Sequence, residues 1–137
     1  MKKLKLVLDS NLWISYFLGK HVRIYLDQIL IDTRFDLLIS QHGIGELTTV
    51  LKRPKFQKYI TTEQIETLIS LILRRSILID VSSQIVLSRD SKDDYLLALS
   101  FDGHADYLIT GDADLLVLEQ FEQTIIIKIA DFIAKYT

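Results

Sequence analysis

The chain has 137 residues, 49% of them hydrophobic and 25% charged, with a formal net charge of −2, and we expect residues 1–137 to form a single globular domain. It contains no cysteine, which excludes disulfides and thiolate metal sites and agrees with a cytoplasmic location. Its apolar runs fall short of the roughly 18 residues that span a bilayer, so we expect no membrane association.

The first half of the chain alternates short apolar runs with helical patterns. Residues 4–8 and 35–39 are too short to form helices and predict two strands. Apolar residues at helical spacing predict three helices, at about 12–17, 21–31 and 40–52. Pro54 is expected to close the last of these, because proline cannot supply the helical N–H.

The second half continues the alternation. Thr61 to Gln64 has the Thr-x-x-Gln form of a capping box and is expected to open a helix, and Gly103 is a candidate cap at the end of another. Further strands are predicted at 77–81, 107–109 and 124–127, and further helices at about 93–102, 113–118 and 129–136. Strands that are unbroken apolar runs between helices are typical of a parallel sheet covered on both faces. We therefore predict an α/β fold, a Rossmann-like three-layer α/β/α sandwich with a central, mostly parallel five-stranded sheet.

Residues 89–116 are the most acidic part of the chain. Seven aspartates against two cations give this segment a net charge of −5, so the remainder of the chain is net +3. Divalent cations prefer carboxylate oxygens, whereas phosphates prefer lysine and arginine. The charge layout therefore indicates a cation site in a body that can bind an anionic substrate.

Four acids are expected at one edge of the sheet. Asp9 follows the first predicted strand and Asp112 follows the fourth. Glu46 and Asp94 lie in the first turns of helices that leave the second and third strands, and sites in open parallel sheets form outside these strand ends. Two carboxylates about 4 Å apart repel by about 4 kcal/mol at an effective dielectric of about 20, so the cluster needs cations or protons. Mg²⁺ or Mn²⁺, as one or two ions, is the expected cofactor.

Four stretches of the sequence resemble the PIN-domain nucleases, and more narrowly the VapC-like toxin components of prokaryotic toxin–antitoxin pairs. They are Val7 to Asn11, Glu46 to Phe56, Arg89-Asp90 with Asp93-Asp94, and Ala105 to Leu116. The resemblance implies a PIN-like fold and an acidic catalytic and metal-binding set of Asp9, Glu46, Asp94 and Asp112. Asp93 is an alternative third acid and Asp114 a further candidate ligand. The resemblance also implies supporting roles for Ser10, Asn11 and Thr110.

The same resemblance implies a metal-dependent endoribonuclease, a hydrolase that cuts RNA phosphodiester bonds. Its partners would be the RNA substrate, a cognate antitoxin and, by family analogy, a second copy of the chain. Phe56 or Tyr59 could stack on a base. The candidate backbone contacts are cations near helix ends, namely Lys52, Arg53, Lys55, Lys58, Arg74 and Arg75.

Each assignment has a plainer alternative. An aspartate between a strand and a helix is a preferred capping residue, and an isolated glutamate is usually solvated. The cations at 52–58 are equally well explained as a solvated helix end. A catalytically silent PIN-like domain that binds RNA or a protein is the second functional hypothesis, which the intact acid set disfavours. A haloacid-dehalogenase-like phosphatase with Asp9 as nucleophile ranks lower, because Asn11 stands where that pattern has another aspartate.

Overall fold

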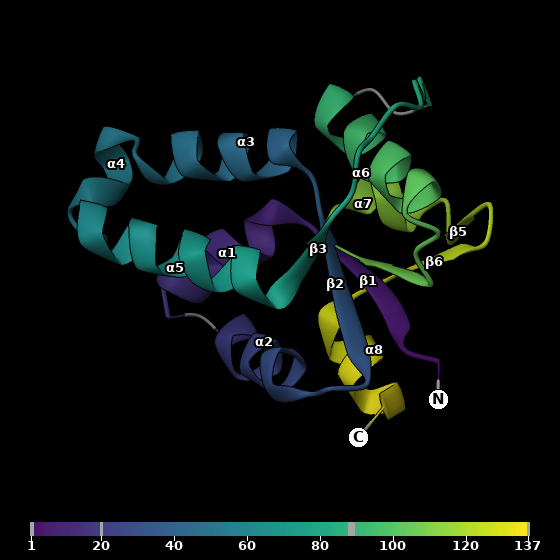
Figure 1. Ribbon diagram of the computed structural model, residues 1–137, viewed down its shortest axis with the longest axis horizontal. Helices are drawn as coiled ribbons and strands as arrows, with labels where there is room; N and C mark the ends of the chain where they lie inside the picture. Colours follow the sequence, from purple (N-terminus) through teal and green to yellow (C-terminus); the bar gives the residue numbers. More distant parts are fainter. Residues whose placement is uncertain (1, 20, 88–89, 137) are drawn as a thin grey trace.

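The computed structural model describes residues 2–19, 21–87 and 90–136, so Arg89 of the acidic segment lies outside the described residues. Within them, six strands form one sheet in the order β3-β2-β1-β4-β6-β5 (Figure 1). The strands are β1 Leu4–Leu8, β2 Phe35–Ile39, β3 Ser76–Leu78, β4 Tyr107–Ile109, β5 Gln120–Phe121 and β6 Thr124–Ile127. Neighbouring strands are parallel except for β5 and β6. The predicted three-layer fold is confirmed, with the two-residue β5 added as an antiparallel edge strand.

The described part of the chain contains eight helices, of which the last follows the final strand. They are α1 Ser10–Phe17, α2 Val22–Ile31, α3 Gln41–Leu51, α4 Pro54–Gln57, α5 Thr62–Arg75, α6 Ser91–Asp102, α7 Ala113–Leu116 and α8 Ile129–Tyr136. No helix among these residues is long and apolar enough to cross a membrane. Pro54 does more than end α3: it occupies the first turn of α4, where its missing N–H costs nothing.

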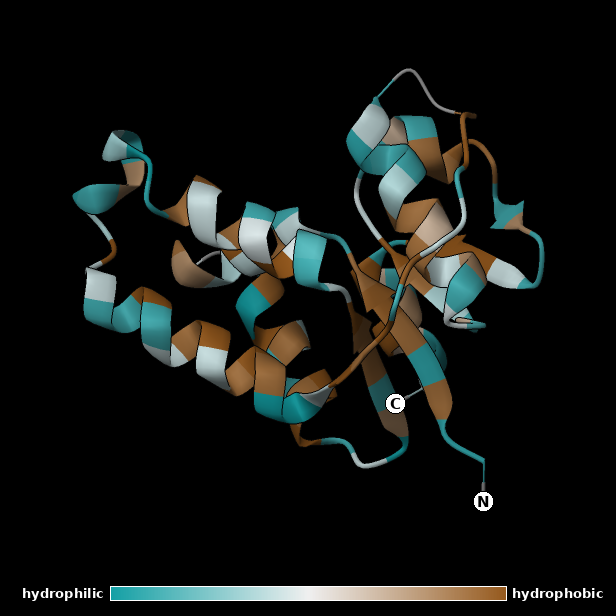
Figure 2. Ribbon diagram, turned by 45° about the horizontal axis from the view of Figure 1, so that its top comes forward, coloured by the Kyte–Doolittle hydropathy of each residue, from teal (hydrophilic) through white to brown (hydrophobic). Residues whose placement is uncertain are grey.

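Helices cover both faces of the sheet (Figure 1). Successive strand residues point to opposite faces, so Leu6 and Ile109 belong to one hydrophobic cluster while Val7 and Leu108 belong to another. The first cluster includes buried residues of α1, α2, α3, α5 and α8, and the second includes those of α6 and α7. Figure 2 shows hydrophobic residues along most of the strand length, as expected for a sheet covered on both sides.

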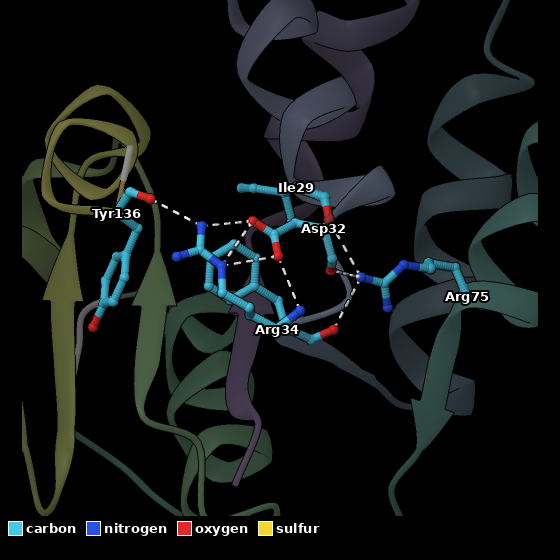
Figure 3. A network of polar contacts seen from close by, with 6 residues as sticks. Ile29, Asp32, Arg34, Arg75 and Tyr136 are labelled. Atoms are coloured by element: carbon cyan, nitrogen blue, oxygen red, sulfur yellow. Dashed lines mark hydrogen bonds and ion pairs between the residues drawn. The ribbon is translucent and has the colours of Figure 1, made fainter. Parts of the chain in front are cut away.

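Two arginines hold the turn between α2 and β2 (Figure 3). Arg34 donates to the Asp32 carboxylate at 2.7 Å and to the Tyr136 carbonyl at 2.9 Å. The Arg75 guanidinium, at the end of α5, donates at 2.8–3.2 Å to the backbone carbonyls of Ile29, Leu30, Asp32 and Phe35. Carbonyl groups at a helix C-terminus lack intrahelical hydrogen-bond donors, and Arg75 supplies donors to those at the end of α2. Arg75 therefore joins α5 to α2 and β2.

The direction of strand succession reverses between β1 and β4. The chain passes from β1 outward through β2 to β3, and then returns to the other side of β1 for β4 and β6. Open sheets of this kind bind ligands where the direction of strand succession reverses, outside the carboxyl ends of the strands. The segments that follow β1 and β4 are therefore the positions from which side chains reach a common site.

Candidate functional site

An aspartate follows each of these two strands. Asp9 comes directly after β1, is 6% exposed, and caps α1 by accepting a hydrogen bond from the Asn11 N–H at 3.1 Å. Asp112 follows β4 and caps α7 by accepting from the Asp114 N–H at 2.8 Å. The capping role is therefore real for both residues. Each cap uses one carboxylate oxygen and leaves the second for another contact.

Thr110 links the two strand ends. Its Oγ1 donates to Asp9 Oδ2 at 2.7 Å and accepts from the Asp112 N–H at 3.1 Å. Thr110 is only 1% exposed, so water does not compete for these bonds. One buried hydroxyl thus fixes the carboxylate of Asp9 relative to the backbone of Asp112.

Asp93, in the first turn of α6, completes a close group of acids. Its side chain is 3% exposed, and carboxylate oxygens of Asp93, Asp112 and Asp114 lie within 4.8 Å of one another. Burial, hydrogen bonding with Asp112 and the charges of Asp112, Asp90 and Asp9 raise the pKa of Asp93 from 3.8 to about 7. This acid group therefore favours binding a proton near neutral pH, and a cation would displace that proton.

Asp94 makes a different contact from its neighbour. Its Oδ1 accepts a hydrogen bond from the Leu87 backbone N–H at 3.0 Å, which ties the segment before α6 to the helix. Of these two aspartates, both in the described part of the chain, Asp93 alone belongs to the close acid group and lines the adjoining cavity. The geometry favours Asp93, the alternative left open by the sequence, as the third acid.

A cavity of about 260 Å³ lies beside this acid group. Its walls come from the start of α1, from β2 and α3, from α4 and from α6. The predicted site residues that line it are Asp9, Ser10, Asn11, Glu46, Asp93, Asp112, Arg53, Lys55 and Phe56. The structure also describes Lys52, Lys58 and Tyr59, and these three residues do not line the cavity. The cavity therefore divides the predicted basic run into two pairs.

Glu46 reaches the cavity from α3. It is half-buried, and its Oε1 lies 3.7 Å from Nε2 of His42, one turn earlier in the same helix. The His42 ring in turn packs on Tyr95 of α6, with the two ring centroids 4.1 Å apart. Glu46 is not part of the close group formed by the described aspartates. The structure thus brings Glu46 into the same cavity but not into that group.

Four polar residues that line the cavity had no role assigned from the sequence: Ser40, Asp90, Lys92 and Tyr95. Ser40 caps α3 and Asp90 caps α6. Ser40 had a recognisable signal, because a cap directly after a parallel strand lies at the ligand-binding edge. The sequence contains no such signal for Lys92 and Tyr95, because only the helical register of α6 brings these two residues to the cavity.

The donor set fits a hard divalent cation. Octahedral Mg²⁺ binds oxygen ligands at about 2.0–2.1 Å, so adjacent ligand oxygens lie roughly 3 Å apart. One carboxylate oxygen from each of the three aspartates of the close group lies within 4.8 Å of the others. Carboxylate-only donors suit Mg²⁺, Ca²⁺ and Mn²⁺ rather than zinc or copper. Asp93, Asp112 and Asp114 could therefore hold Mg²⁺ or Mn²⁺, with Asp9 adding negative charge nearby.

Comparison with known protein families matches residues 5–114 to the family described as PIN domain, while none of the curated proteins matches the sequence. One similar solved structure is VapBC2 from Rickettsia felis bound to a DNA fragment from its promoter, with a TM-score of 0.61 and 15% identity over 90% of this chain and 97% of that one. FitAcB from Neisseria gonorrhoeae gives 0.57 and 17% identity over 91% and 98%. The PIN domain of human SMG5 gives 0.52 and 15% identity over 97% and 99%. At these identities the structural matches establish the fold alone.

Proposed function

Because this chain belongs to the PIN-domain family, we propose that it is a metal-dependent endoribonuclease that hydrolyses RNA phosphodiester bonds. The observation that carries the proposal is the buried carboxyl of Asp93, whose pKa is raised to about 7 among other acids. Burying an acid against like charges opposes folding, and such groups concentrate at functional sites. Capping explains Asp9 and Asp112, whereas the N-cap of α6 is Asp90 and not Asp93.

The acids and the polar residues of the site have different roles in this proposal. Asp93, Asp112 and Asp114 would hold the cation, while Asp9, Glu46 and Asp90 are further acids that line the cavity. A bound Mg²⁺ or Mn²⁺ would activate a water for attack on phosphorus and would stabilise the charge on the phosphate oxygens. Thr110 keeps Asp9 oriented, and Ser10 and Asn11 offer polar groups along the wall that the RNA would contact.

We further propose that the protein is the toxin component of a toxin–antitoxin pair. VapBC2 and FitAcB, which share this fold, are toxin–antitoxin complexes, and this supports an antitoxin partner for the present chain. Expression of the wild-type chain in a bacterium should then arrest growth, whereas expression of Asp112→Asn should not. Growth at the normal rate with wild-type protein that cuts RNA in vitro would contradict the toxin role but not the nuclease.

Cleavage of an end-labelled RNA pool of mixed sequence tests the activity itself. The purified protein should cut this RNA with Mn²⁺ or Mg²⁺ and stop when EDTA is added, and Asp9→Asn should abolish the cutting. Asp131→Asn, an equivalent change at an exposed position of α8, is the matched control and should cut normally. Cutting that survives EDTA, or an Asp9→Asn variant at the wild-type rate, would contradict the proposal. RNA binding without any cutting would identify the silent PIN-like domain instead.

A further inference from the structure

Cations from two separate elements line the cavity beside the acid group. Arg53 and Lys55 come from the start of α4, and Lys92 comes from the first turn of α6. We propose that these three side chains bind backbone phosphates of a single RNA strand that passes through the acid site, and that Lys52 and Lys58 do not. This inference rests on the proposed ribonuclease function and specifies which residues hold its substrate.

Exposure and charge do not distinguish the cations between residues 52 and 58, but their position relative to the cavity does. All four cations between residues 52 and 58 are exposed, and none of them forms an ion pair with a carboxylate in the described residues. Only Arg53 and Lys55 line the cavity that contains the acids. Lys52 is the C-terminal cap residue of α3, where a positive charge is explained by the helix dipole. Lys52 therefore has a structural explanation that Arg53, the residue before the first turn of α4, lacks.

Lys55 is held at the cavity by an aromatic contact. Its Nζ lies 5.1 Å from the centroid of the Phe56 ring, and Phe56 is half-buried against the main hydrophobic cluster. This contact attracts the ammonium without neutralising it, so the charge remains available to a phosphate. Phe56 thus serves as a support for Lys55, because the ammonium already occupies one face of the ring that a base would need.

The two groups of cations come from helices that lie near opposite ends of α3 (Figure 1). Figure 1 shows α4 and α6 near opposite ends of α3, and α3 has 11 residues, which corresponds to about 16 Å at 1.5 Å per residue. With about 16 Å of helix between the backbones that carry them (Figure 1), the two groups can hold successive phosphates of one strand at the same time. The acid group adjoins Lys92, because Asp93 follows it directly in α6. A single-stranded polyanion therefore fits the arrangement better than inorganic phosphate or a mononucleotide.

The salt dependence of RNA binding tests the inference. The variants Arg53→Gln, Lys55→Gln and Lys92→Gln are compared with Lys52→Gln and Lys58→Gln, all in an Asp112→Asn background that leaves the RNA intact. Binding of a labelled single-stranded RNA of mixed sequence is measured by fluorescence anisotropy over a range of KCl concentrations. Each lost phosphate contact should reduce the slope of log affinity against log salt by about 0.7. We expect that reduction, with weaker binding, in the three cavity variants, and an unchanged slope in the two controls.

The outcomes separate this inference from the proposed function. If the wild-type protein cuts RNA but the three cavity variants match the two controls, the inference is overturned and the nuclease stands. The cations would then serve another anionic partner, such as an acidic peptide. If the wild-type protein neither binds nor cuts the RNA with Mn²⁺ or Mg²⁺, the proposed function fails and the inference fails with it. Unchanged melting temperatures in all five variants would exclude misfolding as the cause of weaker binding.

Discussion

Thr110 makes the contact on which the orientation of the acids depends most directly, because its buried hydroxyl joins Asp9 Oδ2 to the Asp112 N–H. Thr110→Val keeps the shape but leaves both partners unsatisfied, which should lower the free energy of unfolding by about 1–3 kcal/mol. A displaced Asp9 should also slow RNA cleavage by about tenfold to a hundredfold. Thr110→Ser retains the hydroxyl and should lose much less of either property. Urea unfolding and cleavage rates check this, and equal behaviour of the two variants would refute it.

Asp93 couples the stability of the metal-free protein to pH. Its pKa is 3.8 ordinarily and about 7 in the folded state, so between these values the folded protein binds more protons than the unfolded chain. The free energy of unfolding should therefore fall as pH rises through this range: the contribution is fully present below pH 3.8 and lost above about pH 7.

Urea unfolding in EDTA across this pH range measures the effect, and Asp93→Asn should flatten the profile. An Asp93→Asn protein with the wild-type pH profile would show that another group is responsible. Added Mn²⁺ should restore stability at the upper end of the range, because binding to the folded state alone shifts the equilibrium.

Among the elements, α5 depends on Arg75 for its connection to the neighbouring α2 and β2. Arg75→Ala removes a charged donor from four backbone carbonyls, and we expect it to lower the free energy of unfolding by about 2–3 kcal/mol. Arg74→Ala changes the adjacent exposed arginine and should stay within about 0.5 kcal/mol of wild type. Urea denaturation compares the two, and equal losses would mean that Arg75 contributes only as a surface charge.

The end of α6 requires glycine for space rather than for an unusual backbone conformation. Gly103 is the predicted C-terminal cap, but its φ is −86°, and His104 takes the positive φ of 53°. A Cβ at Gly103 would lie 2.6 Å from Leu38 Cδ1, so Gly103→Ala should cost about 1–3 kcal/mol. Gly45→Ala within α3 meets nothing within 4 Å and should stabilise by about 0.5–1 kcal/mol. Thermal unfolding of both variants should show shifts of opposite sign, and shifts of the same sign would contradict this explanation.

The sequence predicted most of the elements and missed the short α4 and β5 for a physical reason. The five strands that were predicted are short and mostly apolar, and residues of β1, β2 and β4 alternate between the two hydrophobic clusters. Helix α4 is one turn long, so no helical periodicity can develop, and Pro54 was interpreted only as a stop. Strand β5 has two residues and exists through its pairing with β6. Elements of that length are determined by tertiary contacts that a sequence pattern does not contain.

For the whole molecule, the strand order explains why part of the candidate site could be predicted. Asp9 and Asp112 follow β1 and β4, so the edge that they share is visible as soon as a parallel sheet is inferred. The choice between Asp93 and Asp94 was not visible. Residues 97–100 of α6 are all buried, so the hydrophobic pattern marks no single inward face from which the register of the two acids could be read. The division of the basic run likewise depends on the turn between α3 and α4.

The most direct test of the central claim is the Mn²⁺-dependent cleavage of RNA by Asp93→Asn beside Asp94→Asn. The second variant is a matched control, because an asparagine oxygen can still accept the hydrogen bond from the Leu87 N–H. If the buried acid group holds the cation that supports cleavage, Asp93→Asn should lose cleavage while Asp94→Asn retains it. Wild-type cleavage by Asp93→Asn, or its loss in Asp94→Asn alone, would contradict the assignment of the site.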